Sequence, residues 1–344
     1  MLAATPRLRA VILRCAQAVP VVFGVVVISF LLTRALPGDP AVYFAGVMAD
    51  EASIEETRVA MGLDKPLPQQ FVIYVGELLR GDLGQSLTSG RPVATDLANR
   101  LPASLELTLT ALFLACVIAI PLGILAATRP GTWVDHLCRV IVTAGVSLPT
   151  FFTGIVLIYV FYYLLGIAPS PLGRLDFIYL EPDHITGFYL IDAALVGDWE
   201  TWWGAARQLI LPASTLALFT LAPLARMTRA SMLTALSSDF IRTARAAGLR
   251  RGTVLYAYAF RNALLPVVTT LGMVFSFALG ANVLVEKVFA WPGIGSYAVE
   301  ALVVSDYAAV QGFVLAMALL FVLLNLVIDL LYTVIDPRIG FEAK

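Results

Sequence analysis

The sequence predicts an all-α integral membrane protein with six membrane-spanning helices. Of the 344 residues, 59% are hydrophobic and only 14% are charged, and the mean hydropathy is +0.85. Soluble domains are roughly 45–50% apolar and about 25% charged, so this composition is typical of a membrane protein. Apolar stretches that can cross a hydrocarbon core about 30 Å thick as helices recur along the chain, and the uneven placement of charge predicts their orientation.

Six stretches have the length and composition of membrane spans. They are residues 11–36, 101–128, 137–167, 209–227, 264–288 and 308–335. The first follows three arginines, but its apolar run exceeds the 7–15 residues of a signal-peptide core and no A-x-A cleavage site follows it. We therefore expect an uncleaved anchor.

The basic residues concentrate between the fourth and fifth spans. Seven arginines lie there against one acid, Asp239: Arg226, Arg229, Arg242, Arg245, Arg250, Arg251 and Arg261. By the positive-inside rule this loop is cytoplasmic, and with six spans both termini are cytoplasmic too. The segment between spans three and four carries six acids and two arginines, which suits the outer face.

This topology divides the chain into four segments. Residues 1–36 form an N-terminal cytoplasmic segment and the first span, and residues 37–100 form an extracytoplasmic loop. A five-helix core occupies residues 101–335 with a cytoplasmic loop at 228–262, and residues 336–344 form a cytoplasmic tail.

The outer segments contain two helical patterns. An amphipathic helix that lies over the outer mouth is predicted by the spacing of Phe71, Tyr74, Val75, Leu78 and Leu79. Trp199, Trp202 and Trp203 precede span four and fit an interfacial aromatic belt, but a surface helix without any specific contact is the simpler interpretation.

The motifs of common energy sources and enzymes are missing from the sequence. None of the lysines, Lys65, Lys287 and Lys344, lies in a G-x-x-x-x-G-K-[ST] phosphate loop, so any ATP is bound by another subunit. There is no G-x-S-x-G or H-E-x-x-H motif, and the three cysteines form no C-x-x-C pair. We expect no catalytic residue, metal site, cofactor or nucleic-acid partner.

Three polar residues inside the predicted spans are candidates for a translocation path. They are Asn282 in span five, and Asn325 and Asp329 one turn apart in span six. Such residues also fit an ion-coupled carrier that acts alone. Because Asp329 lies near the cytoplasmic end of its span, a polar contact between packed helices is the simpler interpretation. We expect all three to lie nearer an inter-subunit face than the lipid.

The cytoplasmic loop contains the stretch DFIRTARAAGLRRG, from Asp239 to Gly252. Serines before Asp239 can cap a helix that ends at Gly248, because glycine readily takes the left-handed conformation after a helix. Phe240, Ala244 and Ala247 form a narrow apolar stripe, and the small residues let a partner approach the backbone. A second interpretation is that the arginines only set topology and contact lipid phosphates. Pro266 is expected in the first turn of span five.

The segment DFIRTARAAGLRRGTVLYAYAFRNALLPVVT resembles the cytoplasmic EAA loop of binding-protein-dependent ABC importers, in the form of the dipeptide, oligopeptide and nickel permeases. The order and spacing of further motifs is similar to B-type permease subunits: LPGDPA, MGLDKPLPQQF, GDLGQSL, RLPASLELTL, SLPTFF, VFAWPGIGSYAVEALVVSDYAAVQG and LLYTVIDPRIGF. The chain departs from the family pattern at Arg242, Ala247, Ser305 and Ala308. The segment ITGFYLIDAALVGDW resembles an outer-loop extension found in part of the family.

The resemblance implies a type I ABC importer permease of the bacterial inner membrane that imports di- or oligopeptides, with nickel or glutathione as alternatives. It implies as partners a second homologous permease, two cytoplasmic ABC ATPases, an extracytoplasmic substrate-binding protein and the lipid bilayer. A coupling helix would transmit movement from an ATPase. Its expected residues are Asp239, Phe240, Arg242, Ala244, Arg245, Ala247, Gly248 and Leu249.

Overall fold

The computed structural model describes residues 6–35, 40–46, 49–60 and 62–335, and these residues form helices joined by turns. The first four helices are α1 (Pro6–Ala35), α2 (Pro40–Ala45), α3 (Glu51–Ala60) and α4 (Leu67–Leu79). The next five elements are α5 (Val93–Thr128), α6 (Trp133–Ser147), α7 (Thr150–Leu157), the π-helical η1 (Ile158–Leu164) and α8 (Tyr189–Val196). The rest are α9 (Trp199–Leu236), α10 (Asp239–Ala246), the π-helical η2 (Thr253–Phe260), α11 (Arg261–Val288), α12 (Ile294–Val303) and α13 (Tyr307–Ile335).

Long apolar helices dominate the described part of the chain. Within it, four stretches are long and apolar enough to cross a membrane: Val93–Thr128, Trp199–Leu236, Thr253–Val288 and Tyr307–Ile328. Shorter apolar helical stretches run over Val19–Leu31, Thr150–Leu164 and Ile294–Val303. The prediction of an all-helical membrane protein is therefore confirmed.

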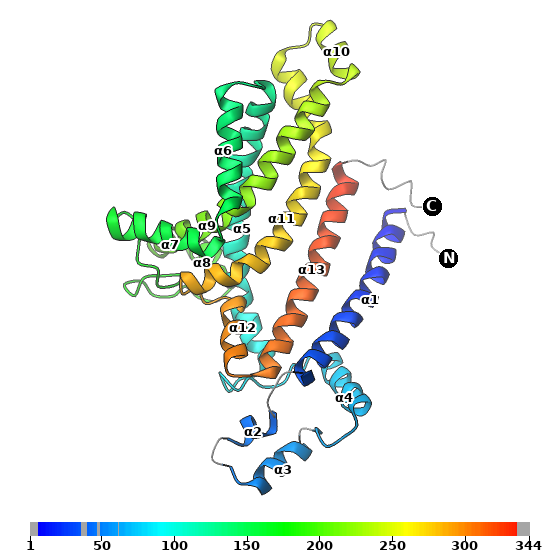
Figure 1. The fold of residues 1–344 in the computed structure, drawn as a ribbon, viewed down its shortest axis with the longest axis vertical. Coiled ribbons are helices and arrows are strands. Elements are labelled where there is room, and N and C mark those ends of the chain that lie inside the picture. The colour runs from blue at the N-terminus through cyan, green and yellow to red at the C-terminus, as the bar shows by residue number, and fades with distance from the viewer. Residues whose placement is uncertain (1–5, 36–39, 47–48, 61, 336–344) are drawn as a thin grey trace.

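The prediction of one continuous third span is wrong. Helix α6 ends at Ser147, and Leu148 has an extended backbone with φ −108° and ψ 138° before Pro149. A proline disfavours helical geometry in the residue before it, because its ring collides with that residue's backbone. The chain therefore turns there, and α7 and η1 run across the bundle away from α6 (Figure 1).

Small residues bring α5 and α9 together at the centre of the bundle. Ala111, Ala115 and Ala119 recur at four-residue spacing on α5 and are fully buried. Gly123 continues the series, and a Cβ there would lie 2.7 Å from the Cβ of Thr228 on α9. Such spacing lets two helix backbones approach closely, which supplies the packing contacts that hold helices together in lipid. These two helices form the axis of the fold.

Helix α9 projects well beyond its predicted span. It has 38 residues, which corresponds to about 57 Å of helix, nearly twice the thickness of a hydrocarbon core. Its last turns carry α10 to one extremity of the molecule, toward which the start of α1 and the end of α13 also lie (Figure 1). This arrangement agrees with the predicted side for the basic loop and both termini.

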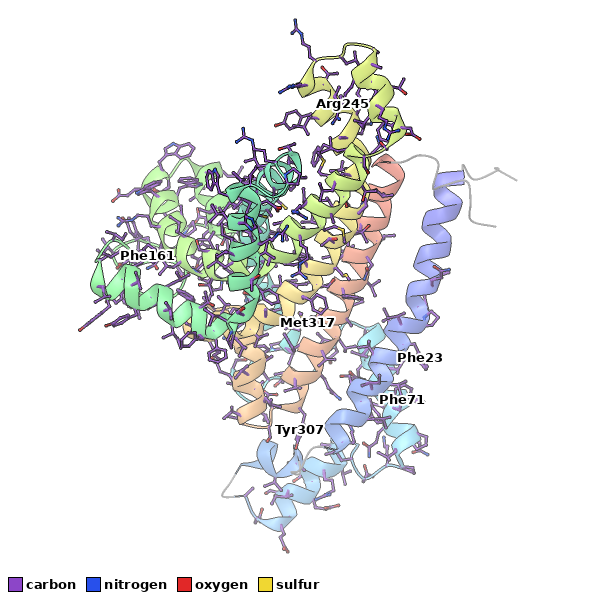
Figure 2. All side chains as sticks on the ribbon, turned by 45° about the horizontal axis from the view of Figure 1, so that its top comes forward. Phe23, Phe71, Phe161, Arg245, Tyr307 and Met317 are labelled. Atoms are coloured by element: carbon purple, nitrogen blue, oxygen red, sulfur yellow. The ribbon has the colours of Figure 1, made fainter. Side chains whose placement is uncertain are left out.

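The opposite end of the molecule holds the segment between α1 and α5. Helix α4 confirms the predicted amphipathic helix, and its Phe71 ring lies 5.2 Å from the Phe30 ring and 6.3 Å from the Phe23 ring of α1. Figure 2 shows the Phe23 and Phe71 side chains next to each other. The helix is thus attached to α1. The expected position over the outer mouth stays a prediction.

The expectation for Pro266 is wrong. The helix of span five begins earlier than predicted, because η2 runs without a break into α11, and Pro266 lies inside that continuous helix. Its position is an interior turn and not the first one.

Candidate functional site

The helix predicted in the basic loop is present as α10, which covers eight residues from Asp239 to Ala246. Its end has the expected left-handed glycine, since Gly248 has φ +74°. The Gly248 N–H donates to the Arg245 carbonyl at 3.0 Å, and the Leu249 N–H donates to the Ala244 carbonyl at 3.3 Å. This pair of bonds is a Schellman motif, which satisfies carbonyl groups left free at the helix end.

The start of α10 is arranged differently from the expectation. Ser238 occupies the cap position, but its hydroxyl donates to the Ala235 carbonyl of α9 at 2.5 Å and caps no N–H of α10. The serine therefore ties α10 to the end of α9 and does not satisfy the first turn.

One face of α10 is anchored to the rest of the chain. Ile241 is fully buried and Ala244 is 6% exposed. They belong to a cluster of residues from α5, α9, η2 and α11, namely Ile124, Ala127, Met232, Ala235, Val254, Ala259 and Ala263. The prediction that Phe240, Ala244 and Ala247 form one stripe facing a partner is wrong for Ala244. Ala244 packs inward, because residues 241 and 244 are three apart and share the face that packs into this cluster.

The other face of α10 is open to solvent. Phe240 is 42% exposed and Leu249 is 39% exposed, and each is a large apolar side chain at the tip of the molecule. The remaining predicted residues, Asp239, Arg242, Arg245, Ala247 and Gly248, are also exposed. Figure 2 shows Arg245 at this tip, at the far end from Tyr307. Seven of the eight residues predicted for the coupling helix therefore share one accessible surface, which we call the α10 tip.

A buried carboxylate stiffens the stem below the α10 tip. Asp135, near the start of α6 and before the predicted third span, is fully buried and accepts from Arg229 of α9 at 2.6 and 2.9 Å. The Gly131 N–H and the Arg139 guanidinium also donate to it, at 3.1 and 3.0 Å. Hydrogen bonds from Arg229 hold the pKa of Asp135 well below its usual range. The ion pair fixes α6 against the projecting end of α9.

Of the three translocation-path candidates, the side chains of Asn282 and Asn325 are described, and they do not contact each other. Asn282 is buried inside the chain and donates to Glu286 at 2.9 Å and to the Ser104 carbonyl at 3.3 Å. Asn325 is exposed and donates to the Phe321 carbonyl of its own helix at 2.9 Å. The side chain of Asp329 lies outside the described residues. Their place beside a translocation path stays a prediction.

Sequence reasoning missed buried acids at the other end of the bundle, and two of them lie inside predicted spans. Glu286 of α11 is 1% exposed, and Glu106 of α5 is 5% exposed. Glu106 forms an ion pair with Arg174 and accepts from the Leu190 N–H at 2.9 Å. Both acids interrupt apolar stretches, where ionisable groups are costly and need a partner. That rule, applied to spans two and five, would have found them.

Among the described residues, no group of three or more His, Cys, Asp or Glu side chains is placed to hold a metal ion. The long apolar helices and the exposed α10 tip together define a polytopic membrane protein with a helical element outside its apolar bundle.

Comparison with known proteins identifies the family. The model of the binding-protein-dependent transport system inner membrane component matches residues 119–341. The model of the N-terminal part of such membrane components matches residues 7–108. The chain belongs to this family of transport system inner membrane components.

Curated relatives align over nearly the full length. The chain is 48% identical to the probable D,D-dipeptide transport system permease protein of Escherichia coli, over 95% of this chain and 96% of the relative. It is 42% identical to the di/tripeptide transport system permease protein of Pseudomonas aeruginosa, over 94% and 96% of the two chains. It is 39% identical to the dipeptide transport system permease protein of Escherichia coli, over 96% and 98%.

The family settles the class that the sequence predicted. The chain is an ABC permease subunit of the inner membrane and not an enzyme, and it works in a system that depends on a binding protein. The prediction that this chain is the membrane subunit of a transport system, and not the subunit that hydrolyses ATP, is therefore confirmed.

Proposed function

We propose that this permease forms half of the translocation pathway by which an ATP-driven importer moves di- or oligopeptides across the inner membrane. The substrate is inferred from the relatives, which are dipeptide, D,D-dipeptide and di/tripeptide permeases at 39–48% identity. A second homologous permease supplies the other half, and an extracytoplasmic binding protein delivers the peptide.

The observation that carries the proposed mechanism is the division of α10 into two faces. Ile241 and Ala244 are held in the chain's own core, so a force on α10 passes to α5, α9 and α11. Phe240 and Leu249 stay exposed, together with Arg242 and Arg245, as a surface for a partner. Isolated helices of eight residues are unstable in water, so this anchoring is what keeps α10 folded.

One of two cytoplasmic ABC ATPases docks on the α10 tip, and the other docks on the second permease. The tip suits this role because an apolar contact at Phe240 and Leu249 gives affinity, and the surrounding arginines fix orientation. When the ATPases close on ATP, α10 moves with them, and the long α9 transmits the movement into the bundle. A rigid stem is required, which the Asp135–Arg229 ion pair provides.

The proposed topology is that of a type I ABC importer permease with six crossings and both termini in the cytoplasm. Helices α1, α5, α9, α11 and α13 supply five crossings, and α6 with the α7–η1 segment replaces a continuous third helix. The proposed segments are residues 1–36, the extracytoplasmic loop 37–100, the core 101–335 with the coupling loop 228–262, and the tail 336–344.

Two alternatives make different predictions. Nickel or glutathione import would use the same permease architecture with another binding protein. An ion-coupled carrier would act alone, but the described polar candidates Asn282 and Asn325 do not form a common site.

Reconstitution distinguishes these functions. The chain is placed in proteoliposomes with its second permease, both ATPases and the binding protein loaded with a dipeptide, nickel or glutathione in turn. We expect dipeptide uptake that requires ATP and the binding protein. Uptake by this chain alone under an ion gradient contradicts the proposal, and uptake of nickel or glutathione but no peptide reassigns the substrate.

A further inference from the structure

The short helix α12 lies between two turns of strained backbone. Ala290 precedes it with φ +50° and Ser305 follows it with φ +57°. All other described residues with positive φ are glycines. A side chain in this left-handed region crowds the next carbonyl oxygen, so such a residue persists only where its surroundings determine it. The two ends of α12 must therefore be held by other contacts.

A buried carboxylate holds the first end. Glu286 accepts from the Ser104 hydroxyl of α5 at 2.5 Å, from the Ser296 N–H of α12 at 2.8 Å and from the Asn282 amide at 2.9 Å. It is 1% exposed. A Cβ at Gly293 would overlap the Glu286 carboxylate and the Ser104 hydroxyl, so the backbone fits closely around this acid. Glu286 thus joins α5, α11 and α12.

Two further bonds fix the turn before α12 to α5. The Trp291 indole N–H donates to the Ala103 carbonyl at 2.9 Å, and the Ile294 N–H donates to the Ser104 hydroxyl oxygen at 2.9 Å. Trp291 is 2% exposed. These bonds leave the Ala290 turn no freedom to relax while Glu286 stays in place.

A second buried carboxylate holds the other end. Asp306 is fully buried and accepts from the Ser86 hydroxyl at 2.7 Å and from the Thr88 N–H at 3.1 Å. It also accepts from the Ala309 N–H in the first turn of α13 at 3.2 Å. The segment between α4 and α5 is thereby bound to the Ser305 turn. Each end of α12 has one strained residue and one buried acid.

These clamps lie at the end of the molecule opposite α10, where the proposed topology places the extracytoplasmic side (Figure 1). We propose that Glu286 and Asp306 are positioning residues that hold α12 as an extracytoplasmic gate. The closed gate stores backbone strain at Ala290 and Ser305. Outward opening releases α12 from one or both clamps and relaxes that strain. The inference rests on the proposed transport function, because a gate needs a pathway to close.

The two kinds of residue predict opposite effects. Removing a clamp favours the open gate, because the bonds that hold the closed form are lost. Replacing a strained residue with glycine favours the closed gate, because glycine takes positive φ at little cost. A merely structural role of α12 predicts no such reversal.

The clamp arm of the test uses Glu286→Gln and Asp306→Asn, with Glu300→Gln as the matched control. Glu300 is on α12 too, but it forms only a partly exposed ion pair with Lys287 at 2.7 Å. Ala301, fully buried on α12, is replaced by cysteine as a reporter, with the three native cysteines changed to serine. The full transporter complex is assembled in nanodiscs without binding protein, and maleimide alkylation and ATP hydrolysis are measured.

We expect each clamp variant to raise the alkylation rate at least about tenfold over the control, a difference of about 1.4 kcal/mol, and to raise hydrolysis without binding protein. Rates equal to the control overturn the inference. Faster alkylation with unchanged hydrolysis also overturns it, because α12 would then be loosened without any effect on the transport cycle.

The strain arm uses Ala290→Gly and Ser305→Gly, which fit the observed backbone and keep every side-chain bond of the clamps. It therefore stays informative if a clamp variant fails to assemble. We expect alkylation to fall several-fold and peptide-stimulated hydrolysis to slow. Unchanged or faster rates in both variants contradict the stored strain. The wild-type complex separates the two proposals: if it does not respond to the dipeptide-loaded binding protein, the proposed function fails, whereas a responsive wild type with unresponsive variants refutes only the gate.

Discussion

Substitution of Gly248 by alanine tests how the α10 tip acts. Gly248 has φ +74°, and a Cβ at this position would meet nothing within 4 Å, so the change has a conformational cost and no packing cost in this chain. An L-residue in the left-handed region costs about 1–2 kcal/mol. If ATPase docking requires the Schellman end of α10, the docked population falls roughly 5–30-fold, as expected for a change of that size.

The assay is ATP hydrolysis by the reconstituted complex with and without peptide-loaded binding protein. We expect Gly248→Ala to lower the stimulated rate by about 5–30-fold, while the free energy of unfolding of the subunit falls by no more than about 1–2 kcal/mol. The matched control is Gly252→Ala in the same loop. Gly252 has φ −62° and also has nothing within 4 Å of its Cβ position. A wild-type stimulated rate in the Gly248 variant, or equal losses in both variants, would show that docking does not depend on the Schellman end of α10.

Three further predictions concern the packing that supports the tip and the outer loop. Asp135→Asn removes the charge partner of Arg229, so the free energy of unfolding, measured by thermal shift, falls by about 1–3 kcal/mol. In the wild type the pKa of Asp135 is depressed in the folded state, so its contribution to stability stays constant between about pH 5 and 8. That contribution is lost only as the pH falls toward the pKa of Asp135 in the folded state. Gly123→Ala overpacks α5 against α9 and costs about 1–3 kcal/mol. Gly76→Ala inside α4 meets nothing within 4 Å, so it leaves the melting temperature unchanged or slightly raised. Arg174→Met leaves the buried Glu106 carboxylate without its cation and costs about 3 kcal/mol. Limited proteolysis of the segment between α7 and α9 therefore accelerates roughly a hundredfold. A wild-type cleavage rate would show that the ion pair does not hold this segment.

The sequence predicts the helical elements best where local chemistry decides them. The end of α10 at Gly248 and the amphipathic helix α4 follow from glycine geometry and apolar spacing, and both are present. The count of basic residues in each loop predicts that the basic loop and the two ends of the chain lie on the same side, because that count depends on composition and not on packing.

Features that depend on tertiary contacts were less predictable. Hydropathy over residues 137–167 is high on both sides of Pro149, so composition alone does not show the turn there. The inward face of α10 depends on α5, α9 and α11, and sequence spacing could not choose between Ile241 and Phe240 as the anchored side chain. Among the partners of Glu286 and Asp306, Ser104 and Ser86 lie 182 and 220 residues away, so the sequence does not show which distant segments each carboxylate joins.

If an ATPase docks on the exposed face of α10, residues on that face lie within crosslinking distance of it. Site-specific photo-crosslinking in the assembled complex measures this contact, with the photoreactive residue placed at position 240, 245 or 249 and, as a control, at the exposed position 303 of α12. We expect crosslinks to an ATPase subunit from the three α10-tip positions and none from position 303. Absence of ATPase crosslinks from all three α10-tip positions would contradict docking on this face.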